Sequence, residues 1–381
     1  MLKRSAREGL RTWIELDRKA LTHNLRLFRR VLPPACRLMA VCKSNAYGHG
    51  LYDLAPLLEE RGVDWFGVDS IVEASTLREK GIRRPILVLG YTLPERFAEA
   101  RRRRVSLTIS SLPNLRALSR AGGRTPFAVH LKIDTGMHRQ GLLPPDWPPA
   151  RRLLAKPGSG LRLEGLYTHF AEAKDPARPE STRGQIREFA AAAEFFGAGG
   201  LRPLLHTGAT AGALNYPEAR YDLVRIGIGL MGLWPSDETR LSWEKTIPVR
   251  PVLSWRSLVA ETKRLRSGDA VGYNFTERLT RATTIGICPV GYWHGFPRSL
   301  SRVGEVLVRG RRARVLGTVS MDMIVIDLTA IPGAGPGDAV TLIGRDGNEV
   351  VEAGEVARKA GVSHYELLTR LNPLIQKIGV G

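Results

Sequence analysis

The stretch "LMAVCKSNAYGHG", from Leu38 to Gly50, contains an apolar run that ends directly in a single lysine, Lys43. An apolar run without alternation is typical of a strand in a parallel sheet, because both faces of such a sheet are covered. Lysine is costly to bury unless it is paired or chemically committed. The stretch therefore predicts a buried strand that ends at a lysine with a chemical role.

Further runs of the same kind follow, separated by segments of helical character such as "RGQIREFAAAAEFFG". Eight strands that alternate with helices in about 200 residues are typical of a (β/α)8 barrel. An open doubly wound sheet is the competing interpretation, but no G-x-G-x-x-G follows the first strand. The expected strands are Leu38–Cys42, Asp64–Asp69, Pro85–Gly90, Val105–Ile109, Phe127–Ile133, Leu161–His169, Arg202–Thr207 and Asp222–Leu230.

The pattern changes after about residue 245, where helical periodicity gives way to short β-rich runs. Segments such as "RPVLSWRSLVAETKRL" and "DMIVIDLT" are separated by Gly, Pro and Asp, which favour turns. We therefore expect an α/β protein with two domains. Residues 1–244 would form an N-terminal (β/α)8 TIM-type barrel, and residues 245–381 a C-terminal mostly-β domain.

The composition is that of a soluble globular protein, with 43% hydrophobic and 25% charged residues. No apolar run approaches the roughly 18 to 20 residues of a membrane helix, and the N-terminus lacks the apolar segment of a signal peptide. Cys36, Cys42 and Cys288 show no metal-type spacing, which predicts a reducing cytoplasm and no metal. The net charge of +20 lacks the interleaved aromatics of a nucleic-acid interface, so we expect a solvated arginine-rich surface.

Several expected strands end in polar residues, and in a barrel of this kind the working residues lie at the carboxyl ends of the strands. A lysine with cationic neighbours there can lose its proton and attack a carbonyl. The glycines at 227 and 229 could let backbone N–H groups bind a phosphate, which favours an aldehyde cofactor that carries one. The polar strand ends are Lys43, Arg139, His169, His206 and Arg225.

These residues lie in motifs that resemble those of the alanine racemase family, in the family order and over nearly the whole chain. "AVCKSNAYGHG" is similar to the family's pyridoxal-phosphate lysine motif. The others are "TWIELDRKALTHNLR", "HLKIDTGMHRQG", "EGLYTHFA", "YDLVRIGIGLMGL", "VGYNFT", "GTVSMDMIVIDLT" and "SHYELLTRLNP".

The resemblance implies a role for each matching residue. Lys43 would bind pyridoxal 5'-phosphate covalently and then act as one base, and Tyr273 from the partner subunit of a homodimer would act as the other. Lys132 matches a position that is often carbamylated. The implied cofactor residues are Lys43, Tyr47, His169, Thr210, Arg225, Gly227, Ile228 and Tyr365, and the implied substrate residues are Arg139, Met321 and Asp322.

The resemblance further implies a cytoplasmic racemase that interconverts L-alanine and D-alanine by this two-base mechanism and supplies D-alanine for peptidoglycan. Arg225 at the cofactor's ring nitrogen distinguishes the chain from the related decarboxylases, which use an acidic residue there. A racemase of another or broader range of amino acids, such as serine, lysine or ornithine, remains the alternative. A cofactor-binding regulatory protein without turnover would lack Lys43 or Tyr273, and both are present.

Two positions depart from the family pattern. The strand-7 motif of the family usually reads Asn-Ser after the histidine, whereas "HTGATAG" has Ala209 and Thr210. In "GYWHG", His294 stands where an aspartate usually precedes the last glycine. Alanine cannot form a side-chain hydrogen bond. Both departures bear on the surroundings of the cofactor or the substrate entrance.

Overall fold

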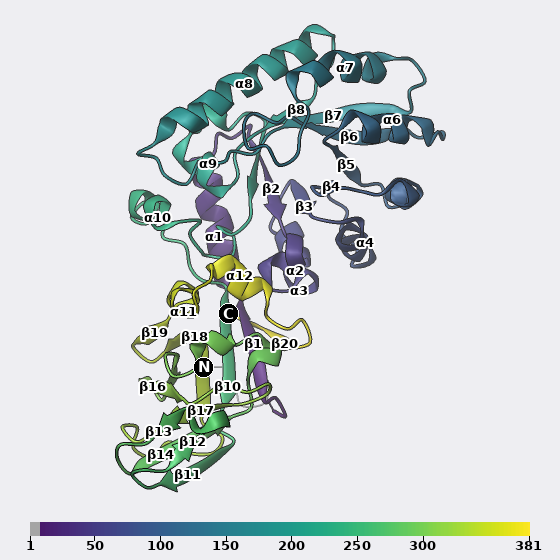
Figure 1. Ribbon diagram of the computed structural model, residues 1–381. Coiled ribbons are helices and arrows are strands. Elements are labelled where there is room, and N and C mark those ends of the chain that lie inside the picture. The colour runs from purple at the N-terminus through teal and green to yellow at the C-terminus, as the bar shows by residue number, and fades with distance from the viewer. Residues whose placement is uncertain (1–7) are drawn as a thin grey trace. The chain divides into compact units, whose positions relative to one another are not determined.

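The computed structural model describes residues 8–381 and divides into two compact units, which are described separately (Figure 1). The barrel unit comprises residues Leu21–Ala46 and Leu54–Arg250. The β unit comprises the described residues up to Ala20 together with Tyr47–Asp53 and Pro251–Gly381. In the described part of the chain, no helix has the length and apolar character needed to cross a membrane.

The barrel unit contains an eight-stranded parallel sheet with the strand order β8-β7-β6-β5-β4-β3-β2-β9. The two end strands approach each other, since the N–H of Asp222 donates to the carbonyl of Leu205 at 3.1 Å, and the barrel is nearly closed. The expected fold class is confirmed. The strands are β2 (Arg37–Val41), β3 (Trp65–Val68), β4 (Ile86–Val88), β5 (Ser106–Ile109), β6 (Phe127–Lys132), β7 (Leu161–Tyr167), β8 (Leu204–His206) and β9 (Leu223–Ile226).

Helices alternate with these strands, and α6, α7 and α8 lie along the outer face of the sheet (Figure 1). Local sequence fixes where some of them begin. Ser70 precedes α4 and its hydroxyl accepts from the N–H of Glu73 at 3.3 Å, as an N-cap residue does. The helices are α1 (Arg18–Val31), α3 (Leu51–Glu60), α4 (Ile71–Glu79), α5 (Phe97–Arg102), α6 (Leu112–Arg120), α7 (Trp147–Ala155), α8 (Pro179–Ala198), α9 (Thr210–Asn215) and α10 (Asp237–Trp243).

The β unit is built on a sheet with the strand order β11-β14-β17-β16-β15-β18-β10-β1-β20, with β19 paired to β18. Two short helices, α11 (Ala353–Ala360) and α12 (His364–Thr369), complete it. The strands are β1 (Thr12–Asp17), β10 (Leu253–Leu258), β11 (Glu261–Leu265), β12 (Ala270–Val271), β13 (Glu277–Arg278), β14 (Thr283–Cys288), β15 (Glu305–Val308), β16 (Arg311–Leu316), β17 (Ile324–Asp327), β18 (Ala339–Asp346), β19 (Glu349–Val351) and β20 (Gln376–Val380).

The first strand of the chain belongs to this second sheet. β1 pairs antiparallel with β10, where Trp13 lies opposite Arg256, and parallel with β20, where Trp13 lies opposite Gln376. The N-terminal segment therefore folds with the C-terminal third of the sequence. The expected domain boundary between residues 244 and 245 stays a prediction.

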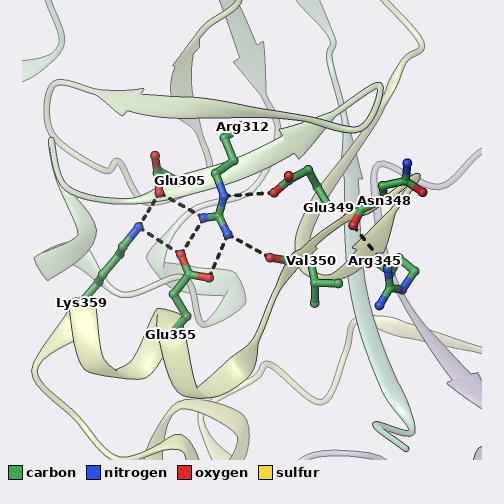
Figure 2. A network of polar contacts seen from close by, with 8 residues as sticks. All are labelled: Glu305, Arg312, Arg345, Asn348, Glu349, Val350, Glu355 and Lys359. Carbon is green, nitrogen blue, oxygen red and sulfur yellow. Dashed lines mark hydrogen bonds and ion pairs between the residues drawn. The ribbon is translucent and has the colours of Figure 1, made fainter.

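A network of charged side chains joins β15, β16, β19 and α11 in the β unit (Figure 2). Arg312 lies at its centre and donates to Glu355 at 2.6 Å and to Glu305 at 3.1 Å, and its Nε is 3.4 Å from Glu349. Lys359 forms a second ion pair with Glu355 at 3.1 Å. Hydrogen bonds from Lys359 and Arg312 lower the pKa values of Glu305 and Glu355, respectively, although burial opposes both shifts.

We expect Arg312→Ala to destabilise the protein, because it leaves three carboxylates close together with only Lys359 to balance them. Isolated exposed pairs contribute little, but the loss of a shared partner should cost about 1–2 kcal/mol and lower Tm by about 2–4 °C. Thermal unfolding by circular dichroism measures this. Arg345→Ala is the matched control, since within residues 8–381 the side chain of Arg345 forms a single hydrogen bond, to the carbonyl of Asn348 at 3.4 Å. An equal loss in both variants would contradict the network's role.

Candidate active site

Lys43 lies where β2 ends, and the chain after it forms a left-handed turn, α2 (Lys43–Tyr47). The φ angles of Ser44, Asn45, Ala46 and Tyr47 lie between 53° and 55°. Each such L-residue costs roughly 1–2 kcal/mol relative to a right-handed helix, so the turn must be held from outside. Helix α4 stabilises this left-handed turn in part, because the carboxylate of its residue Glu73 accepts a hydrogen bond from the N–H of Asn45 at 3.1 Å. Strain of this kind is characteristic of functional sites.

Arg225, on β9, is only 3% exposed and lies inside the barrel. Its two Nη atoms donate to the carbonyls of Thr168 (2.8 Å), Thr207 (2.8 Å) and His206 (3.0 Å), and to one ring nitrogen each of His206 (3.0 Å) and His169 (3.3 Å). Burial lowers the pKa of Arg225 to about 10, so it stays protonated at neutral pH. Within residues 8–381, no acceptor contacts its Nε, which leaves this N–H available to a bound molecule.

Lys132 and Arg139 add two further cations to the same unit. Lys132, at the end of β6, is 5% exposed and its Nζ donates to the Gln140 side chain at 3.3 Å. Burial lowers the pKa of Lys132 to about 8, and the charges of Arg139, Arg225 and Lys43 act in the same direction. A substantial fraction of this amine is therefore neutral near physiological pH.

The loop that carries Arg139 is folded back on itself. The Asp134 carboxylate accepts from the N–H groups of Gly136 and His138, both at 3.0 Å, and Leu142 donates its N–H to the carbonyl of Lys132 at 2.8 Å. Gly141 is required at the closure, because a Cβ there would lie 2.3 Å from the backbone nitrogen of Asp134. Arg139 is exposed on this rigid loop.

His169 follows β7 and faces Arg225 through its Nδ1, 3.3 Å from an Nη of the guanidinium. Burial lowers the pKa of His169 well below its ordinary value, and the charge of Arg225 lowers it further. The ring is therefore neutral, and its Nδ1 must accept because a guanidinium can only donate. The single N–H of His169 is on Nε2.

The loop after β9 and the start of α9 form a small cradle. The N–H of Gly227 donates to the hydroxyl of Thr210 at 3.3 Å. In the described part of the chain, no hydrogen bond uses the backbone N–H groups of Ile228 or Gly229. A Cβ on Gly229 would lie 2.5 Å from the Phe28 ring and 2.8 Å from the Thr210 side chain, so only glycine fits there. Free N–H groups beside a hydroxyl suit a phosphate.

In the β unit, Tyr47 and Tyr365 lie together, with ring centroids 6.1 Å apart. Gly48 permits this approach of the chain to α12, because a Cβ at its φ of +81° would meet the Leu368 carbonyl oxygen at 1.9 Å. Burial raises the pKa of Tyr365, which keeps its hydroxyl protonated and able to donate. The structure thus brings together two of the residues expected to bind the cofactor phosphate.

Tyr273 and Met321, also in the β unit, lie on neighbouring segments. Gly272 lies against the backbone of Thr318, and the hydroxyls of Thr276 and Thr318 are 3.0 Å apart. Tyr273 is 67% exposed and Met321 is 54% exposed. Asp322, next to Met321, is exposed as well. These side chains are therefore presented on the surface of the unit.

Both departures from the family pattern have local structural consequences. The ring of His294 is buried and its Nδ1 accepts from the N–H of Gly291 at 3.2 Å, which closes the turn that contains it. Burial lowers the pKa of His294, consistent with this acceptor role. Ala209 occupies the N-cap of α9 without a side-chain hydrogen bond.

Three residues of the barrel interior were missed or given no role by sequence reasoning. His206 was recognised as a strand end only, and His130 and Glu164 were not singled out. They form a connected polar group beneath Arg225. The available signal was the two-residue period of a strand, which places His130 on the same face of β6 as Lys132. Polar side chains on the inner face of a barrel are unusual, because branched apolar residues normally fill it.

The comparisons with known proteins agree with this arrangement. Residues 16–235 match the N-terminal domain of alanine racemase and residues 252–378 its C-terminal domain. The alanine racemase of Symbiobacterium thermophilum is 41% identical over 95% of both chains. The solved alanine racemase of Clostridium difficile 630 superposes with a TM-score of 0.92 at 29% identity, over 98% of this chain and 96% of that one. That of Bacillus anthracis, solved with bound L-Ala-P, gives 0.90 at 32% identity, over 97% and 95%.

The (β/α)8 barrel, the lysine at a barrel strand end and the two matched domains place the chain in a class of isomerases that act on amino acids. The chain belongs to the alanine racemase family. It is accordingly an enzyme, an amino-acid racemase, and the expected family is confirmed.

The uncapped start of α9 leads to a prediction about Ala209. We expect Ala209→Ser to stabilise the protein by about 1 kcal/mol, because a serine hydroxyl can accept from an N–H in the first turn of α9. Chemical denaturation measures the free energy of unfolding. Ala209→Val is the control, since valine does not cap a helix, and an equal gain in both variants would rule out capping as the cause.

Proposed function

We propose that this racemase uses pyridoxal 5'-phosphate to interconvert L-alanine and D-alanine, with Lys43 and Tyr273 as its two bases. The observation that carries the proposal is the placement of Lys43 at the end of β2, in the barrel that buries Arg225 with an available Nε–H. The names of the relatives support alanine as the substrate. His294 and Ala209 have local roles, so neither favours another amino acid.

The residues present fit the cofactor. Lys43 would bind its aldehyde carbon covalently. The cradle of Thr210, Gly227 and Ile228 suits its phosphate, and we assign the hydroxyls of Tyr47 and Tyr365 to the same group by their family positions. When bound, pyridoxal phosphate spreads the negative charge that develops at the substrate Cα into its ring.

Arg225 and His169 would contact that ring. The Nε–H of Arg225 suits the ring nitrogen, because an arginine donates a hydrogen bond without readily giving up its proton. The ring nitrogen then stays unprotonated, which limits how strongly it withdraws electrons and disfavours transamination. The neutral His169 has its Nε2–H available beside Arg225.

Proton movement at Cα requires two groups on opposite faces of the substrate. The amine of Lys43 would hold or release the proton on one face and the hydroxyl of Tyr273 on the other. For each direction of the reaction, one of them accepts the proton from Cα while the other donates a proton to it. Because the proton leaves one face of Cα and another proton arrives on the opposite face, the configuration at Cα is inverted while the substrate stays in place.

Arg139 and Met321 would bind and orient the substrate carboxylate, and Asp322 beside Met321 would line the substrate site. We propose that Lys132 is carbamylated, since a buried amine whose pKa is about 8 is nucleophilic enough to take up CO2 near neutral pH. The carbamate would give Arg139 an anionic partner and hold its guanidinium in one orientation. Protonation of the amine below about pH 8 would oppose carbamylation.

We propose a homodimer in which Tyr273, Met321 and Asp322 complete the partner's site. The exposure of Tyr273, Phe275 and Met321, each more than half exposed, supports this, because large apolar side chains that gather on a surface mark an interface. The proposed role is cytoplasmic supply of D-alanine for peptidoglycan.

We expect Lys43→Ala to abolish covalent attachment of pyridoxal phosphate. The visible absorption of the loaded protein should disappear, and borohydride reduction followed by peptide mapping should find no labelled lysine at this position. Lys132→Met is the matched control, because it removes another lysine at a barrel strand end and should leave the label on Lys43. A label that persists in Lys43→Ala at another lysine would refute the assignment.

We expect Tyr273→Phe to slow proton removal from one enantiomer by about 10²–10⁴-fold and to spare the other. Exchange of the α-hydrogen with D2O, followed separately for L-alanine and D-alanine, measures this. Tyr292→Phe controls for the loss of an exposed tyrosine hydroxyl in the same unit.

The shared site can be tested by mixing the two inactive variants. Heterodimers of Lys43→Ala and Tyr273→Phe subunits contain one intact pair of bases if each site uses Lys43 from one chain and Tyr273 from the other. Activity should return to a fraction of the native level. Purified heterodimers without activity would indicate that each chain forms its own site.

A further inference from the structure

A line of polar side chains runs through the barrel interior from Arg225 to Glu164. An Nη of Arg225 lies 3.0 Å from Nδ1 of His206, and Nε2 of His206 lies 2.8 Å from Nδ1 of His130. Nε2 of His130 in turn lies 3.4 Å from the Glu164 carboxylate, a polar contact without the geometry of a hydrogen bond, and no hydrogen bond satisfies this Nε2 in the described part of the chain. Both rings are fully buried. The line crosses β9, β8, β6 and β7.

The direction of every hydrogen bond in this line follows from Arg225. A guanidinium only donates, so Nδ1 of His206 accepts and its proton must be on Nε2. That N–H donates to Nδ1 of His130, which places the proton of His130 on its own Nε2, pointing at Glu164. The opposite direction would require Arg225 to accept, which it cannot do.

Both rings have to be neutral for this pattern to hold. Burial lowers the pKa of His206 well below its ordinary value, and the charge of Arg225 lowers it further. Burial also lowers the pKa of His130, although the nearby Glu164 opposes this. Each neutral ring carries a single N–H. That of His206 donates to His130, and that of His130 lies beside the Glu164 carboxylate without forming a hydrogen bond.

The backbone of β6 and β7 has two features that make room for this line of polar side chains. The pairing of the two strands shifts at a β-bulge, so that Val129 lies opposite Leu163 and His130 lies opposite Gly165, with Glu164 as the extra residue. A Cβ on Gly165 would lie 2.1 Å from Nδ1 of His130. Only glycine therefore fits beside the His130 ring. The bulge changes the direction in which the side chain of the extra residue, Glu164, leaves the strand.

Glu164 supplies the negative charge that Arg225 lacks in its immediate surroundings. The direct partners of Arg225 are carbonyls and imidazoles, with no carboxylate among the residues described. Burial would raise the pKa of Glu164, but the neighbouring His130 ring and the hydrogen bond from the Ser106 hydroxyl outweigh it and lower the pKa to about 2. Arg162 also donates to Glu164, at 2.8 Å. The carboxylate is therefore ionised under all physiological conditions.

We propose that Glu164, His130 and His206 are positioning residues that fix the orientation and hydrogen-bond donors of Arg225 through this relay. The consequence for the cofactor, a fixed Nε–H at its ring nitrogen, rests on the proposed function. The relay itself is a property of the barrel and exists without it.

The first test reads the tautomers directly. In protein labelled with ¹⁵N-histidine, two-bond ¹H–¹⁵N spectra at neutral pH should show His130 and His206 neutral, with the proton on Nε2 in both. The variants His130→Gln and His206→Gln assign the signals, and His130→Asn and His206→Asn replace them where folding fails. A proton on Nδ1 of either ring, or a charged ring, would overturn the relay.

The second test breaks the relay at its anionic end. Glu164→Gln should shift the His206 ring signals and, in the enzyme loaded with pyridoxal phosphate, alter the cofactor's absorption and lower kcat by about 10-fold with little change in KM. Glu164→Asp should recover part of this. Glu172→Gln, an exposed glutamate in the loop after β7, is the matched control and should behave as the native protein.

The outcomes separate the two proposals. Unchanged His206 signals in Glu164→Gln would show that the carboxylate does not act through the rings. Shifted signals with unchanged cofactor absorption and kcat would refute the positioning role. Failure of the native protein to bind pyridoxal phosphate would refute the proposed function while leaving the tautomer result to stand by itself.

Discussion

The burial of the Arg225 guanidinium is the constraint on which the site depends. A cation inside a barrel is tolerated only when its hydrogens are satisfied. Two of its acceptors, the carbonyls of Thr168 and Thr207, are available because β7 and β8 have just ended and their ladder hydrogen bonds stop there. The charge then acts on its surroundings, since it contributes to the lowered pKa values of His169, His206 and Lys132. Burial is the larger cause of each lowered pKa, and the charge of Arg225 adds to it, so three basic groups are largely or partly neutral.

The barrel and the position of Lys43 could be predicted because both follow from patterns of residues that are close together in the sequence. Parallel strands covered on both faces are continuous apolar runs. Seven of the eight expected runs contain a strand of the barrel, and the first, Leu38–Cys42, overlaps β2. The residues that follow such runs lie at one end of the barrel by topology alone, which is why Lys43, His169 and Arg225 could be grouped before their contacts were known.

Other features depend on contacts between distant residues and left no local pattern. The left-handed turn after Lys43 has no glycine among Ser44–Tyr47 to mark it, and it persists because groups such as Glu73 hold it. The pairing of β1 with β10 and β20 is decided by the far end of the chain. The bulge at Glu164 looks like ordinary strand sequence, and its effect appears only when β6 lies beside it.

The two imidazoles explain how a site can contain both a strong cation and its counter-charge. A carboxylate placed against Arg225 would occupy its donors and cancel its field where the substrate reacts. Coulomb attraction weakens with distance, so an anion two rings away offsets the cost of burial while the field at the cofactor end persists. The neutral rings of His130 and His206 carry no charge themselves. Their contribution is to fix which nitrogen of each ring carries the proton, and so which atom donates and which accepts. An arginine held in this way would stay a donor to the ring nitrogen of the proposed cofactor instead of becoming half of an ion pair.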